Sequence, residues 1–164
     1  MALIAHLRLT DYDLCGYSLG GRTVARMLVL GAKPRRAVIA GMGLEGLLDT
    51  GKRRDFFEHV LKGSGTHERG SGAWLADSFM QTNGGDPAAL LSLLGSFVDT
   101  TPGELAVVRT PTLVLAGVDD HDNGAGEALA KLLPHATHVT IPGDHMSAVV
   151  KPELALAIGD FLAA

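Results

Sequence analysis

Two short runs of the sequence, Ala37–Ala40 and Thr112–Ala116, are aliphatic at nearly every position. A strand with one wet face alternates apolar and polar residues, whereas a strand covered by helices on both faces is apolar throughout. Both runs therefore predict inner strands of a parallel sheet. Parallel neighbours are joined by crossovers of a dozen or more residues, usually helices, so we expect helices next to these strands along the chain.

The segments around these runs fit this expectation. The segments 12–16 and 137–141 predict further strands, and apolar residues at helical spacing predict helices at 19–30, 125–133 and 152–162. Strands that alternate with helices indicate βαβ units. The sequence therefore predicts an α/β fold with about four parallel strands and flanking helices.

The segment from residue 44 to residue 105 differs from both flanks. Ten of the 21 glycines lie between Gly41 and Gly85, where helical pieces are separated by glycine-rich turns and no strand pattern is present. Turns of this composition are mobile because glycine restricts the backbone least. We expect a helical insertion at 44–105 between two parts of one core, at 1–43 and 106–164.

Composition and charge exclude several classes of protein. Apolar residues make up 46% and charged residues 20%, as in ordinary globular chains. A net charge of −4 gives no electrostatic reason to expect nucleic acid. No apolar run approaches the roughly 18 residues that span a bilayer, and the first residues do not have the pattern of a signal peptide. With Cys15 as the single cysteine, we expect a cytoplasmic protein without a membrane segment or an internal disulfide.

The sequence Gly16-Tyr17-Ser18-Leu19-Gly20 lies between a predicted strand and a predicted helix. In that setting G-x-S-x-G predicts a nucleophile elbow, a strained turn that lifts the serine hydroxyl above the sheet. We expect glycine at positions 16 and 20 because a Cβ at either would collide with the turn. The Leu19 N–H and the helix N-terminus would stabilise a developing oxyanion. An ordinary serine in a tight turn is the alternative.

Four segments together resemble the α/β-hydrolase family. Residues 11–28 resemble its nucleophile strand, elbow and following helix, and residues 37–43 resemble the next strand. Residues 110–120 resemble the strand that ends in the triad acid, and residues 141–145 the loop that carries the histidine. The order serine, acid, histidine is that of the family. The resemblance implies a partial α/β-hydrolase fold in which the middle insertion is a helical cap.

The resemblance also implies roles for individual residues. Ser18 is the nucleophile, and His145 takes its proton and later returns it to the leaving group. Asp120, three residues after Gly117, would hold the imidazole in the required tautomer, with Asp119 as the competing acid. A surface histidine is the alternative for His145.

The implied activity is that of a carboxylesterase-like serine hydrolase without a cofactor, which cleaves short acyl esters through an acyl-enzyme. Perhydrolysis by the same triad is a variant of it. We expect the substrate pocket to be lined by Tyr17, Met42, Trp74 and Phe79, although aromatic residues of a cap can equally pack its own small core. The acidic cluster at 119–122 lacks the spacing of an EF-hand, so no metal site is predicted.

The chain departs from the family pattern at its start. In a full member several strands precede the nucleophile strand, and a loop among them supplies a second oxyanion N–H, whose loss typically costs about 10²–10³ in kcat. Here only about ten residues precede the predicted strand at 12–16. That strand would be an open edge, so we expect a homodimer or higher homo-oligomer. The alternative function is a weakly active or inactive remnant that serves as an oligomerising or binding module.

Overall fold

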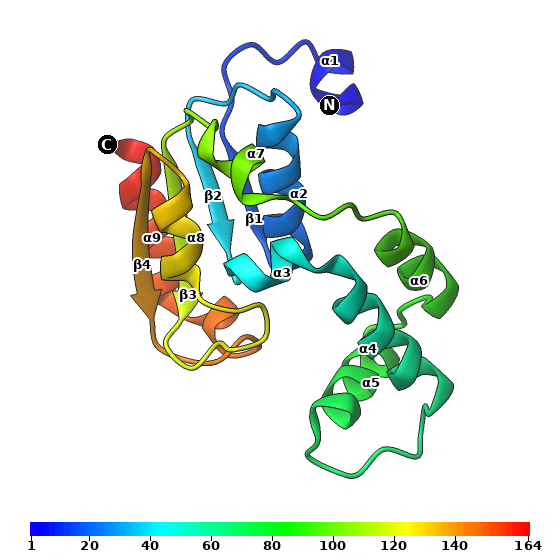
Figure 1. The fold of residues 1–164 in the computed structure, drawn as a ribbon. Helices are drawn as coiled ribbons and strands as arrows, with labels where there is room; N and C mark the ends of the chain where they lie inside the picture. Colours follow the sequence, from blue (N-terminus) through cyan, green and yellow to red (C-terminus); the bar gives the residue numbers. More distant parts are fainter. The chain divides into compact units, whose positions relative to one another are not determined.

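Four strands form at the four predicted strand segments in the computed structural model, which describes residues 1–164. The strands are β1 (Leu14–Tyr17), β2 (Ala37–Ala40), β3 (Thr112–Gly117) and β4 (Ala136–Ile141). They lie in chain order in one fully parallel sheet (Figure 1). Every residue of β2 and β3 is buried, as expected for strands with helices on both faces. The predicted fold class is confirmed.

Seven helical segments accompany the sheet within its own compact unit, residues 1–48 and 100–164. They are α1 (Ala2–His6), α2 (Leu19–Val29), α3 (Leu44–Leu48), α7 (Pro102–Ala106), α8 (Gly126–Leu132), the 3₁₀ turn η1 (Ala148–Val150) and α9 (Pro152–Ala163). The predicted insertion, residues 44–105, includes α3 and all of α7 except Ala106, whereas the compact unit formed with the sheet includes both helices.

Each face of the sheet has its own apolar cluster. On one face α2 and α8 cover alternate residues of the inner strands, such as Ile39 and Val114. On the other face α9 covers the residues between them, such as Val38 and Leu115. The clusters alternate because successive side chains of a strand point to opposite faces. The carboxyl ends of the strands are thereby held at one edge of a rigid sheet.

The second compact unit, residues 49–99, consists of helices alone. They are α4 (Thr50–Lys62), α5 (Gly72–Thr82) and α6 (Pro87–Gly95), and α4 contacts both of the others. Each helix begins at a side-chain N-cap, namely Asp49, Ser71 and Asp86, which accepts hydrogen bonds from backbone N–H groups of the first turn. These caps and the glycine turns between them set the helix boundaries.

β1 is an edge strand, because it pairs with β2 on one side only. The preceding helix α1 buries none of its residues. The open edge that we expect from the sequence is therefore present. The oligomer that we expect to cover it stays a prediction. Among the helices, none has both the length and the apolar character needed to cross a membrane.

Candidate active site

Ser18 occupies the turn between β1 and α2 with φ 54° and ψ −113°. Non-glycine residues rarely adopt positive φ, and such strain persists only where the surroundings enforce it. Here the Ser18 N–H donates to the Ala40 carbonyl at 2.8 Å, and the Ser18 carbonyl accepts from the Arg22 N–H at 3.0 Å. The neighbouring strand and the new helix thus hold the residue from both sides, in the strained turn that the motif predicts.

The glycines of the motif have different steric roles. A Cβ on Gly16 would collide with the carbonyl carbon and oxygen of Gly20, and a Cβ on Gly21 would lie 2.8 Å from the Ala40 oxygen. A Cβ on Gly20 would meet nothing within 4 Å apart from its own helix. The expectation of a collision at Gly20 is therefore wrong. Close packing of α2 on β1 and β2 requires Gly16 and Gly21 instead.

The structure brings Ser18, His145 and Asp120 together. His145 Nε2 lies 2.8 Å from Ser18 Oγ, and His145 Nδ1 lies 2.9 Å from Asp120 Oδ2. Both contacts fit one tautomer, in which Nδ1–H donates to the carboxylate and Nε2 accepts from the hydroxyl. The side chains of His145 and Asp120 are only 7% and 3% exposed. The arrangement can take a proton from the serine and stabilise the resulting imidazolium.

Asp120, and not its competitor Asp119, contacts the imidazole. Asp119 is exposed, and its N–H donates to the Gly143 carbonyl at 3.1 Å. The Asp120 N–H donates to the Gly117 carbonyl at 3.1 Å, in a tight turn directly after β3. This turn directs the second aspartate toward His145 and leaves the first in solvent.

The loop that carries Asp120 is tied to the segment after β2. The Asn123 amide donates to the Gly41 carbonyl at 3.0 Å, in a buried hydrogen bond. The Ala125 N–H donates to the Glu45 carboxylate at 3.0 Å. Sequence reasoning did not identify Asn123 or Glu45, because each bond joins residues about eighty positions apart.

The loop that carries His145 is stabilised locally by Asp144 and Ser147. The Asp144 carboxylate accepts from the Ser147 hydroxyl at 2.7 Å and from the Ser147 and Met146 N–H groups at 2.8 and 3.0 Å. Bonds from the Ser147 hydroxyl and N–H lower the pKa of Asp144, so it is ionised at neutral pH. Aspartate side chains often accept from the backbone N–H two residues on, as Asp144 does from Met146, so the sequence could have indicated this turn.

The remaining predicted site residues lie in different places. Leu19 begins α2, so its N–H is in the first turn, where no intrahelical acceptor exists. The Tyr17 ring lies 5.4 Å from the His145 imidazole. Met42 is 2% exposed and packs in the core cluster. Trp74 and Phe79 belong to the helical unit, so the structure joins only Tyr17 and Leu19 to the triad, and the pocket remains a prediction.

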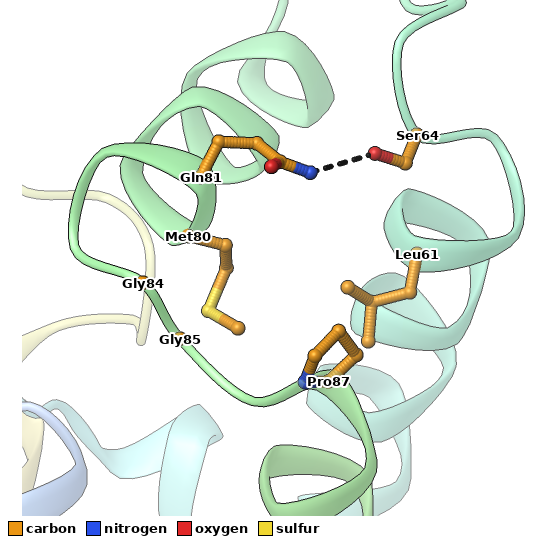
Figure 2. Close-up of a pocket in the computed structure, with 7 residues that line it drawn as sticks. All are labelled: Leu61, Ser64, Met80, Gln81, Gly84, Gly85 and Pro87. Atoms are coloured by element: carbon orange, nitrogen blue, oxygen red, sulfur yellow. Dashed lines mark hydrogen bonds between the residues drawn. The ribbon is translucent and has the colours of Figure 1, made fainter.

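The helical unit has a cavity of its own, of about 220 Å³. Leu61, Met80 and Pro87 form its apolar wall, and the Gln81 amide donates to the Ser64 hydroxyl across its rim at 3.2 Å (Figure 2). None of the predicted pocket residues lines this cavity. No group of three or more His, Cys, Asp or Glu side chains is placed to hold a metal ion.

Solved structures resemble the chain along almost its whole length. An α/β-hydrolase from a Medee basin deep-sea metagenome library is 22% identical with a TM-score of 0.70, and the match covers 99% of this chain and 69% of that one. A bromoperoxidase from Bacillus anthracis (23%, 0.66) and an enol-lactonase from Burkholderia xenovorans (18%, 0.62) match 99% of this chain and 71% and 69% of their own. This chain has the α/β-hydrolase fold.

In the α/β-hydrolase fold the nucleophile, acid and histidine come in that order along the chain, and here they follow β1, β3 and β4. No protein-family model and no curated protein matches the sequence. The likeness therefore establishes the fold, and the activity rests on the geometry of the site.

Proposed function

We propose that this α/β-hydrolase-fold chain is a serine hydrolase that cleaves carboxylic esters through an acyl-enzyme on Ser18. The observation that carries the proposal is the hydrogen-bonded series from Ser18 through His145 to Asp120, with the serine in a strained elbow. A serine hydroxyl becomes nucleophilic when an adjacent base, itself oriented by a third group, takes its proton.

The reaction would proceed in two halves. Ser18 Oγ attacks the ester carbonyl carbon while its proton moves to His145 Nε2, and Asp120 stabilises the imidazolium. The Leu19 N–H would donate to the tetrahedral oxyanion. The carbon–oxygen bond then breaks, and His145 protonates the leaving alcohol. Water attacks the acyl-enzyme with His145 again as base, which releases the acid and restores Ser18.

Exposed apolar side chains next to the triad favour uncharged acyl esters as substrates. Leu19 and Met146, which follow the nucleophile and the base in sequence, are both exposed apolar side chains. The enol-lactonase among the structural neighbours supports an ester substrate, since a lactone is a cyclic ester. Two neighbours described as bromoperoxidases favour a variant in which hydrogen peroxide replaces water and gives a peroxyacid. Peroxyacid formation measured beside ester hydrolysis separates the two acceptors.

The first test is hydrolysis of p-nitrophenyl acetate and butyrate by the purified chain and by Ser18→Ala. We expect turnover that disappears in the variant, because the activated hydroxyl is the nucleophile. Equal rates in both proteins would refute the proposal.

The second candidate is a remnant that acts as an oligomerising or binding module. The open edge of β1 supports it, because an uncovered strand offers backbone groups to a partner. Covalent labelling of Ser18 by a fluorophosphonate requires an activated hydroxyl, so labelling excludes an inactive remnant. The homodimer and the cytoplasmic location remain proposals, and sedimentation at micromolar concentration tests the first of them.

A further inference from the structure

We propose that Tyr17 is a positioning residue that sets the distance between nucleophile and base, an inference that rests on the proposed hydrolase function. The Tyr17 hydroxyl donates to the backbone carbonyl of His145 at 2.6 Å. Tyr17 is the last residue of β1 and directly precedes Ser18. One side chain therefore connects the strand that carries the nucleophile to the loop that carries the base, across 128 positions of sequence.

The tyrosine ring is itself held in place. Gly41 has φ +58°, and a Cβ there would lie 2.7 Å from Tyr17 Cζ. The ring therefore occupies space that any other residue at position 41 would fill. The ring is also tilted at 40° to the imidazole of His145, with centroids 5.4 Å apart. A ring confined in this way keeps its hydroxyl at the carbonyl of His145.

The donor is present at every pH at which a histidine base works. Burial, followed by the negative charges of Asp120, Asp144 and Asp122, raises the pKa of Tyr17 to about 12. The hydroxyl therefore stays protonated, and a backbone carbonyl can only accept. The bond is not weakened by the acidic surroundings of the triad.

The other contacts around His145 fix different parts of its geometry. Asp120 orients the ring from the loop after β3, and Asp144 with Ser147 fixes the shape of the histidine loop within itself. Tyr17 adds a connection to the strand before Ser18. Because a misplacement of about 1 Å can lower a rate by about 10²-fold, a bond that fixes this distance acts directly on kcat.

The test compares Tyr17→Phe with Tyr12→Phe, a change at the other tyrosine of the chain. Phenylalanine keeps the ring against Gly41 and removes the hydroxyl. We expect kcat for p-nitrophenyl butyrate to fall about 10- to 100-fold in Tyr17→Phe, with KM within about twofold, because binding is retained and geometry is lost. Tyr12→Phe should match the wild type.

Two further measurements separate positioning from a structural defect. The final extent of fluorophosphonate labelling counts folded sites, so Tyr17→Phe should reach the wild-type extent at a rate reduced as much as kcat. The low-field proton resonance of His145 Nδ1–H, bound to Asp120, reports the ring position without turnover. It should be present in the wild type and in Tyr12→Phe, and broadened or lost in Tyr17→Phe.

The outcomes distinguish this inference from the proposed function. An unchanged labelling rate, or an unchanged low-field resonance in Tyr17→Phe, overturns the positioning role while the hydrolase stands. If the wild-type protein shows the resonance but is not labelled, the hydrolase proposal is overturned. The positioning role is then still decided by whether the resonance changes in Tyr17→Phe. A wild-type protein with neither labelling nor the resonance overturns both, because the imidazole is then not held against Asp120 and Ser18 is not activated.

Discussion

Replacement of Asp120 by asparagine removes one negative charge with little change in shape. In the structure Asp120 Oδ2 lies 2.9 Å from His145 Nδ1, and both side chains are almost fully buried. The charge centres of carboxylate and imidazolium are then about 4 Å apart, and at an effective dielectric constant of about 20 their attraction is about 4 kcal/mol. Since about 1.4 kcal/mol corresponds to a factor of ten in rate, loss of the charge lowers kcat about 10³-fold. An amide that donates to Nδ1 would impose the wrong tautomer and add to the loss.

The assay is hydrolysis of p-nitrophenyl butyrate near neutral pH, with thermal unfolding to show that the variant is folded. Asp119→Asn is the matched control, because it removes the same charge from the neighbouring exposed position. We expect it to stay within about twofold of the wild type, as exposed substitutions usually do. A loss below about tenfold in folded Asp120→Asn, or the larger loss in Asp119→Asn, would refute this account of the triad acid.

Three further predictions follow from the packing and the pKa shifts. Gly16→Ala should unfold or severely destabilise the chain, whereas Gly20→Ala should leave stability equal or raise it by about 0.5–1 kcal/mol, as thermal denaturation will show. Because the pKa of Tyr17 is raised in the folded chain, its protonated hydroxyl stabilises the fold fully at pH values below the ordinary tyrosine pKa of about 10. This stability should be lost as pH rises toward about 12. Urea titrations should show this alkaline loss in the wild type and not in Tyr17→Phe. Bonds from the Gly65 N–H and the Ser64 hydroxyl lower the pKa of Asp77. The carboxylate therefore stabilises the fold above the ordinary aspartate pKa, and this stability is lost as pH falls through the lowered pKa. Unfolding followed by circular dichroism should show Asp77→Asn less stable than the wild type at neutral pH, with the difference vanishing in acid.

The sheet could be predicted from the sequence because its signals are local. Buried parallel strands such as β2 are apolar at every position, and the glycine-serine motif marks the turn into α2. The limits of β1 were less accurate, at 12–16 against Leu14–Tyr17. Residues 12 and 13 of the predicted strand do not pair in the sheet, although tyrosine is a residue type common in strands.

The residues that support the triad could not be predicted, because their partners are distant in sequence. Nothing near Tyr17 indicates that its hydroxyl meets a carbonyl 128 residues later, and nothing near Asn123 indicates Gly41. The error at Gly20 has the same origin. Whether a Cβ collides depends on the packing of α2 against β1 and β2, which a motif does not specify.

The chain leaves the sheet unit and returns to it at one place. The Thr100 N–H donates to the Leu47 carbonyl at 2.9 Å, and within the helical unit Thr50 N–H and hydroxyl both donate to the Asp99 carboxylate. Residues 49–99 therefore form an insertion whose two ends lie close together, so a linker of a few residues could replace it. Because loop-closure entropy grows by only about 0.6 kcal/mol per doubling of length, the sheet tolerates long or short inserts there. At this position we expect the core to accept an insertion of different length or sequence without a change in its strands.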